Sequence, residues 1–200
     1  MGSAAPGGGR DVLDSLPLLQ MMPDELRRVV ADSFVPVSAS FGSEIVKEGD
    51  PADAFYVIAS GRARALKAGP GGQELPLTIL RAGDSFGEMG LLDGAKRTAT
   101  VRASSDVSLL KMDGAVFQAL LRSYPEIRTF FGLQTRHRDV ANFFRVYAPF
   151  AKLGPRSLSL LVAELEQVEY PAGTRVVTQG GPADAMYIVK EGRLQAFRDA

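Results

Sequence analysis

Short apolar segments, several of them rich in β-branched or aromatic residues, fill much of the first half of the chain. They run over 34–37, 44–47, 54–59, 62–67, 75–80, 98–102 and 107–111. Turn signals separate them, among them Gly42-Ser43 and Gly69-Pro70-Gly71-Gly72. Such segments, bounded by glycine and proline, are typical of β-strands. Many short strands at close spacing predict an antiparallel β-roll or jelly-roll barrel, so the expected fold class is α+β and mainly β.

Apolar residues recur at helical spacing on both sides of this β-rich region. Residues 11–31 predict two short helices, with Pro23 at the start of the second, where a missing N–H costs nothing. Asp113 is expected to cap a helix that ends near Tyr124-Pro125, and a longer helix is expected from Glu126 to about Tyr147. The roll should therefore be flanked by N-terminal and C-terminal helices.

The chain then repeats part of itself. After one more predicted helix over Ser157–Glu166, capped by Ser157, residues 179–193 align without gaps to 48–62 at an offset of 131, as from Glu48 to Gln179. A repeat of that length indicates a duplicated domain rather than a solenoid unit. The second copy stops before several strand equivalents, so it should expose unpaired edges. We expect a chain cut from a longer protein, or a second copy that docks on the first.

These patterns divide the sequence into three parts. Residues 1–10 are small and glycine-rich and predict a disordered tail. Residues 11–148 form the first complete domain, and 149–200 hold the N-terminal part of a second, truncated copy.

Composition narrows the classes of function. Lys and Arg together number 23, as do Asp and Glu, so no overall field attracts nucleic acid or anionic lipid. Cysteine is absent and His137 is the single histidine, which excludes disulfides, thiol catalysis and histidine-rich metal sites. No apolar run is long enough to span a bilayer and no signal peptide is evident. We expect a cytoplasmic protein, or the cytosolic part of a membrane protein. The richness in alanine, arginine and glycine suggests a bacterial source.

The segment from Gly83 to Val101 has the residues needed to hold a small anion. At Gly87 and Gly90 a ligand can approach the backbone closely, and a helical turn over 87–92 would offer free N–H groups to phosphate oxygens. Arg97 could complete the charge with its planar fork of donors. Glu88 repels phosphate but suits a sugar hydroxyl, as acidic residues do for ribose in dinucleotide folds. A phosphate beside a ribose hydroxyl indicates a nucleotide.

Phe86-Gly-Glu-Met-Gly-Leu-Leu92, followed by Arg97-Thr98-Ala99, resembles the phosphate-binding cassette of cyclic nucleotide-binding domains. The resemblance extends from about Leu13 to the end of the chain, in tandem copies of the catabolite activator or protein kinase regulatory subunit type. It implies that Glu88 takes the ribose hydroxyl and that Arg97 and the amides of residues 89–91 hold the cyclic phosphate. The expected ligand-binding residues are Leu80, Phe86, Gly87, Glu88, Met89, Gly90, Leu91, Arg97, Thr98 and Ala99. The ligand would be cAMP or cGMP, with no further cofactor and no metal.

Two other interpretations of this segment remain open. Glu88 and Arg97 could form a structural ion pair in a domain of the same fold that binds no nucleotide. Gly83-Asp-Ser85-Phe-Gly87 also fits the nucleophile-elbow pattern, with Ser85 as nucleophile and His137 as base. That pattern needs a long helix after the serine, and Asp93-Gly94 interrupts the segment soon after it. We therefore expect no catalytic residue and no enzyme activity.

The resemblance predicts a regulatory sensor in which binding moves the helices between Asp113 and Tyr147. Phe130, Phe131 and Leu133 are candidates for covering the base, although aromatic residues at helical spacing more often pack in a core. Thr78 and Leu80 would share a strand face and could line the base pocket, with core packing the simpler role for Leu80. Thr98 permits cGMP, and we lean to cAMP. The expected partner is an effector domain beyond residue 200 or a separate kinase, transporter or channel, with no direct nucleic acid contact and a possible homo-oligomer.

Overall fold

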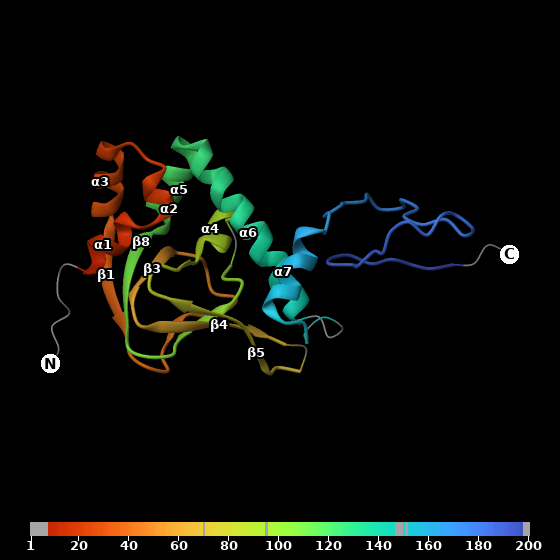
Figure 1. The fold of residues 1–200 in the computed structure, drawn as a ribbon, viewed down its shortest axis with the longest axis horizontal. Helices are drawn as coiled ribbons and strands as arrows, with labels where there is room; N and C mark the ends of the chain where they lie inside the picture. The colour runs from red at the N-terminus through yellow and green to blue at the C-terminus, as the bar shows by residue number, and fades with distance from the viewer. Residues whose placement is uncertain (1–7, 70, 95, 147–149, 151, 198–200) are drawn as a thin grey trace. The chain divides into compact units, whose positions relative to one another are not determined.

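A computed structural model describes residues 8–69, 71–94, 96–146, 150 and 152–197 (Figure 1). These residues fall into two compact units, Met1–Lys152 and Leu153–Ala200.

The first unit is an antiparallel roll of two four-stranded sheets. One has the order β1-β8-β3-β6 and the other β2-β7-β4-β5. The strands are β1 (Phe34–Ala39), β2 (Glu44–Val46), β3 (Ala54–Ser60), β4 (Arg62–Ala68), β5 (Glu74–Arg81), β6 (Ser85–Phe86), β7 (Thr100–Ala103) and β8 (Val107–Asp113). The mainly antiparallel fold predicted from strand spacing is confirmed. Two details differ, because β7 begins at Thr100 rather than 98, and the short strand β6 lies in a segment where none was predicted.

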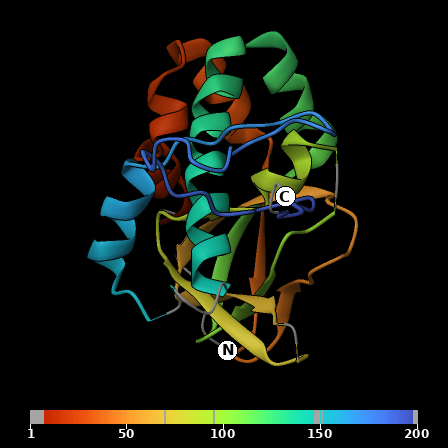
Figure 2. The same cartoon turned by 90° about the vertical axis from the view of Figure 1, so that its right-hand side faces the viewer.

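Helices gather at one end of the roll, and one long helix runs beside it (Figures 1 and 2). They are α1 (Gly8–Asp14), α2 (Pro17–Gln20), α3 (Asp24–Asp32), α4 (Glu88–Leu92), α5 (Gly114–Ser123) and α6 (Pro125–Val146). The N-terminal region thus has three helices instead of two, and α1 begins inside the predicted tail. Residues 1–7 of that tail lie outside the described residues. Asp113 caps α5 as predicted, since its carboxylate accepts a hydrogen bond from the Ala115 amide at 2.8 Å.

Two apolar clusters hold the first unit together. One lies between the helices and the β1-β8-β3-β6 sheet, and its centre is three phenylalanines, Phe55, Phe117 and Phe131, whose ring centroids are 4.9–5.5 Å apart. The other lies between the two sheets and includes Tyr56, Leu80 and Phe86. Burying large apolar side chains is the main favourable term in folding. The roll and its covering helices therefore form a rigid frame for the cassette.

The second unit contains α7 (Pro155–Ala163) and then, over the described residues 164–197, turns without helix or strand. The predicted N-cap at Ser157 is wrong, because Gly154 occupies that position and Pro155 begins the helix. Gly173, Gly180 and Gly192 have φ of 84°, 78° and 90°, close to 83°, 88° and 86° at the repeat equivalents Gly42, Gly49 and Gly61. The turns of the repeat thus recur without its strands.

Apolar side chains in the second unit are exposed where the first unit buries their equivalents. Met186 and Leu194 are 72% and 61% exposed, whereas Phe55 and Ala63 are 1% and 0% exposed. No helix among the described residues combines the length and apolarity needed to cross a membrane.

Candidate nucleotide-binding site

The first unit contains a cavity of about 260 Å³ between the roll, α4 and α6. Nine of the ten residues that the sequence predicted for the ligand line it. They are Leu80, Phe86, Gly87, Glu88, Met89, Gly90, Arg97, Thr98 and Ala99. The tenth, Leu91, packs its side chain in the helix-side apolar cluster instead. The structure therefore brings the two halves of the cassette to one hollow, which also receives Val46, Ala65, Leu77, Thr78, Ile79 and Asp84 from the roll and its loops.

Glu88 is a buried acid with one unused oxygen. It is the first residue of α4 and is 1% exposed. Its Oε1 accepts a hydrogen bond from Arg138 Nη1 at 2.7 Å, whereas Oε2 is buried and has no hydrogen-bond partner among the described residues. A buried polar atom left without a partner costs about 1–3 kcal/mol. The arrangement suits a ligand that brings a hydroxyl donor to Oε2.

Arg97 is held by three contacts on the other side of the cavity. Its Nη2 donates to Asp53 Oδ1 at 2.7 Å, and its Nη1 donates to the Gly87 carbonyl at 3.2 Å. The guanidinium carbon lies 5.7 Å from the centre of the Tyr56 ring, within the range of a cation–π interaction. Tyr56 in turn stacks on Phe86, with ring centroids 5.1 Å apart. Arg97 is 4% exposed, so its charge is available mainly to the cavity.

Glu88 and Arg97 are not paired with each other in the described interactions. Glu88 bonds to Arg138 on α6, and Arg97 bonds to Asp53 between β2 and β3. The alternative in which the two cassette residues form a structural ion pair is therefore not supported by these contacts. Each of the two charged side chains thus has its own ion-pair partner, and Glu88 Oε2 has no hydrogen-bond partner among the described residues.

Two glycines in the cassette leave no room for a side chain. Gly87 has φ of +94°, and a Cβ there would lie 2.6 Å from Arg97 Nη1 and 2.8 Å from the Ala54 carbonyl oxygen. At Gly90, a Cβ would lie 2.7 Å from that of Ala52 and 2.8 Å from the Lys96 carbonyl oxygen. These contacts explain why glycine is needed at both positions.

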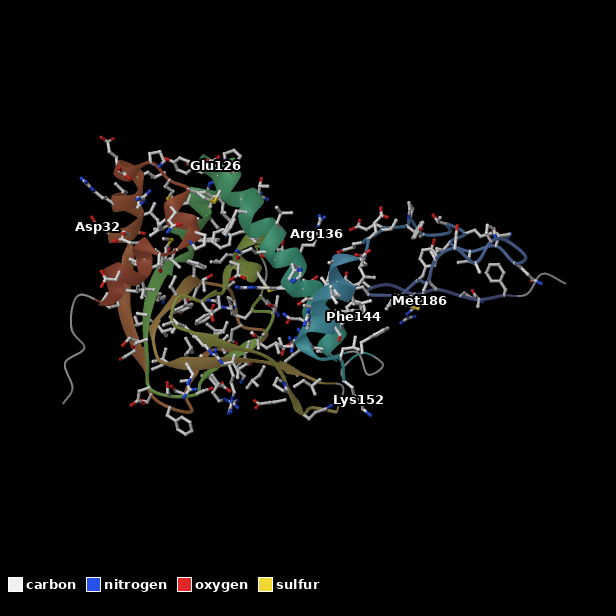
Figure 3. All side chains as sticks on the ribbon, viewed as in Figure 1. Asp32, Glu126, Arg136, Phe144, Lys152 and Met186 are labelled. Carbon is white, nitrogen blue, oxygen red and sulfur yellow. The ribbon has the colours of Figure 1, made fainter. Side chains whose placement is uncertain are left out.

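One wall of the cavity comes from α6, the helix that was expected to cover the base, but from residues that the sequence did not predict. Its lining residues are His137, Arg138, Ala141, Asn142 and Arg145. The proposed covering residues Phe130, Phe131 and Leu133 lie nearer the start of the helix and do not line the cavity. Phe131 is 2% exposed in the core, Phe130 packs against that core, and Leu133 is 65% exposed to solvent. Figure 3 labels Glu126 and Phe144 near the two ends of α6, and the lining residues fall in the half that contains Phe144.

Comparison with known proteins finds a family match that includes the roll and the cassette. Residues 36–124 match the family model of the cyclic nucleotide-binding domain. These residues belong to the cyclic nucleotide-binding domain family.

The chain is similar to a regulatory subunit of one protein kinase and to part of another protein kinase. The cAMP-dependent protein kinase regulatory subunit of Dictyostelium discoideum is 31% identical over 86% of this chain and 50% of its own length. A cGMP-dependent protein kinase of Caenorhabditis briggsae is 27% identical over 93% of this chain and 23% of its own. The regulatory domain of Toxoplasma gondii protein kinase A, solved with cAMP, is 29% identical with a TM-score of 0.57, over 62% of this chain and 47% of that one. The chain thus spans half or less of each of these proteins.

Ser85 does not have the setting of a hydrolase nucleophile in this cyclic nucleotide-binding domain. It lies in the two-residue strand β6 and is followed by the five-residue helix α4. No non-glycine residue in the described part of the chain has a positive φ, so the strained turn of a nucleophile elbow is missing there. The Ser85 carbonyl instead accepts a hydrogen bond from Arg138 at 3.1 Å. These features do not support the serine-hydrolase alternative for Ser85.

Asp53 should give the domain a specific dependence on acid pH. Partial burial raises the pKa of Asp53, but the hydrogen bond and the charge of Arg97 outweigh it and hold this pKa below its ordinary value of 3.8. A carboxyl whose pKa is lowered on folding stabilises the native state above its unfolded pKa. That stabilisation is lost as the pH falls through the folded value.

We therefore expect Asp53→Asn to lower the thermal unfolding midpoint at pH 6, and the difference from wild type to shrink as the pH falls below the ordinary pKa of 3.8 toward the lower folded value. Asp53 is 65% exposed, so after discounting for solvent the effect should be about 1 kcal/mol or less. Thermal unfolding followed by circular dichroism from pH 3 to pH 7 measures it. Asp50→Asn is the matched control, since Asp50 is exposed and contacts Arg97 through its backbone only. A difference that persists unchanged at the lowest pH would contradict this assignment.

Proposed function

We propose that the first unit binds cAMP or cGMP in this cavity and acts as a ligand-controlled regulatory domain. The observation that carries the proposal is the buried Glu88 with its unpartnered Oε2, in the same cavity as a separately held Arg97. A guanidinium suits the single negative charge of a cyclic phosphate, and a carboxylate oxygen suits a ribose hydroxyl. The relatives named above, one cAMP-dependent and one cGMP-dependent, support the same ligand class.

We propose that the other residues lining the cavity surround the purine base. With the phosphate at Arg97 and the ribose at Glu88, the base extends toward the apolar side chains of Ala65, Leu77 and Leu80 on one side. Asn142 and Arg145 of α6 offer polar groups on the other. Thr98 also lines the cavity, with its hydroxyl 3.6 Å from Met89 Sδ. We propose a purine of either kind as the base, and our preference remains cAMP.

Arg138 connects the ligand site to α6. Its Nη1 donates to both the Glu88 carboxylate and the Ser85 carbonyl, so one α6 side chain is bonded to the cassette and to the strand before it. A ribose hydroxyl that donates to Glu88 changes the strength of the hydrogen bond between Glu88 and Arg138. The position of α6 then depends on the ligand. Such a shift can equal only the difference in ligand affinity between the two helix positions, which is typically about 1–3 kcal/mol.

The controlled effector is a protein or domain outside the described residues. Kinases fit the relatives, and a transporter or channel remains a further candidate. The cytoplasmic location, the bacterial source and the possible homo-oligomer stay predictions. The domain boundaries at 11–148 and 149–200 are likewise our proposal.

The test is calorimetric titration of the chain with cAMP, cGMP, 2′-deoxy-cAMP and AMP. We expect micromolar or tighter binding of at least one cyclic nucleotide. Binding of 2′-deoxy-cAMP should be weaker by about 10-fold or more, because a hydrogen bond to a charged group contributes about 1.5–3 kcal/mol. AMP should also bind weakly, because its dianionic open phosphate does not match a site built around one guanidinium. Binding of neither cyclic nucleotide would leave a ligand-free interaction module of the same fold.

A further inference from the structure

The ladder between β4 and β7 ends just before the cavity. Its last registered pair is Leu66 with Thr100. The two residues before Thr100 in the chain, Thr98 and Ala99, form a bend and line the cavity. A segment that leaves its ladder loses the hydrogen bonds between strands that fix its position. The bend that presents Thr98 and Ala99 to the ligand therefore depends on other contacts.

Lys67 makes such a contact from outside the cavity. It follows Leu66 in β4, and its Nζ donates to the Thr98 carbonyl at 2.8 Å. The same ammonium lies 2.9 Å from Glu48 Oε1, in an ion pair whose side chains are 35% and 26% exposed. Glu48 Oε2 accepts a hydrogen bond from the Ala68 amide at 2.8 Å. One carboxylate thus fixes the ammonium relative to the β4 backbone.

The backbone around Glu48 holds the same segment a second time. The Glu48 amide donates to Thr100 Oγ1 at 3.0 Å. The Gly49 amide donates to the Arg97 carbonyl at 2.9 Å, and the Arg97 amide donates to the Asp50 carbonyl at 2.8 Å. Arg97 to Thr100 therefore lie against a support formed by the loop after β2 and the end of β4. Neither Lys67 nor Glu48 lines the cavity itself.

We propose that Lys67 and Glu48 are positioning residues of the nucleotide site, acting through the Thr98 carbonyl to set the bend at 98–99. The inference rests on the proposed function, since it concerns how that site holds its ligand. Loss of the ammonium frees the bend without removing any group that contacts the nucleotide. The expected result is faster ligand dissociation with an unchanged fold, because a less ordered site must be ordered again on binding.

The experiment compares wild type, Lys67→Met, Lys67→Arg and Glu48→Gln by titration with cAMP and cGMP and by stopped-flow dissociation. Lys67→Met keeps most of the side-chain stem and should weaken binding about 3- to 10-fold, mainly through dissociation, given the modest net worth of such contacts. Lys67→Arg should restore most of the affinity, because it keeps both the charge and a donor. Lys67→Met and Glu48→Gln should be less than additive when combined, because they remove the same contact. Lys47→Met is the charge-matched control on a nearby exposed lysine.

A ligand-independent measurement accompanies the titrations. Amide hydrogen exchange over residues 96–103 should be faster in Lys67→Met than in wild type, with the thermal midpoint within the range of the Lys47→Met control. Unchanged affinity and exchange in Lys67→Met would overturn the positioning role while leaving the proposed function intact. A lowered midpoint that Lys67→Arg does not restore would mean a merely structural role and would overturn it too. A wild-type chain that binds neither nucleotide refutes the proposed function, and this inference with it.

Discussion

Arg97→Gln should weaken cyclic nucleotide binding by about 100-fold, since hydrogen bonds to charged groups contribute about 1.5–3 kcal/mol each and the guanidinium forms more than one with a phosphate. Arg97 is 4% exposed and is held by Asp53, the Gly87 carbonyl and the Tyr56 ring. Arg97→Lys should be intermediate, because an ammonium keeps the charge but not the planar fork. Titration calorimetry with the preferred nucleotide measures both variants.

The control for this prediction is Arg102→Gln. Arg102 also forms short ion pairs, with Glu74 and Glu44 at 2.6 and 2.8 Å, but it does not line the cavity. Its replacement should leave affinity within about 2-fold of wild type, as expected for a surface ion pair remote from the ligand. If Arg97→Gln remains folded by circular dichroism and binds as tightly as Arg102→Gln, the assigned phosphate contact is wrong.

Glu88→Gln should remove the preference for ribose. The amide has nearly the shape of the carboxylate, but it is neutral, so affinity for cAMP should fall about 10- to 100-fold with the loss of a charge-assisted hydrogen bond. Affinity for 2′-deoxy-cAMP should change little, because that ligand brings no hydroxyl to Oε2. The two ligands and two proteins form a double-mutant cycle that isolates this one contact.

Glu88→Gln also removes the charged partner of Arg138, so part of its effect on binding can come from Arg138. Arg138→Gln tests this side of the interaction, and it should alter α6 more than it alters ribose preference. The movement of α6 can be followed by fluorescence from a probe attached to the Leu133→Cys variant. Leu133 is exposed, and the chain otherwise has no cysteine. Equal losses for cAMP and 2′-deoxy-cAMP in Glu88→Gln would show that Glu88 serves packing rather than the sugar.

Local sequence patterns predicted the parts of this domain that depend on local physics. The strands rich in apolar residues, the Asp113 cap and the helical turn over 87–92 all follow from neighbouring residues, and all appear in the structure. The phosphate-binding cassette could also be recognised, because most of its predicted ligand-binding residues lie between 86 and 99. The N-cap of α7 was misassigned because Pro155 at the first helical position outweighs the nearby serine.

Contacts between distant segments could not be derived in this way. Asp53 holds Arg97 across 44 residues, and Arg138 reaches Glu88 across 50. The aromatic stripe on α6 suggested a cover for the base, but Phe131 packs against Phe55 and Phe117 in the core. Only tertiary packing decides which turn of a long helix faces the cavity. Arg138, Asn142 and Arg145, spaced four and three residues apart, were the available polar signal for that helix face.

The close contacts around Gly87 and Gly90 bear on any attempt to convert this domain into a biosensor for other metabolites. A methyl group at either position would lie 2.8 Å from a backbone oxygen. Substitutions at these glycines should therefore give variants that misfold or do not bind a ligand. Ala141, Asn142 and Arg145 lie on one helix face and line the cavity. Diversity placed on α6 is the practical route to new ligand selectivity.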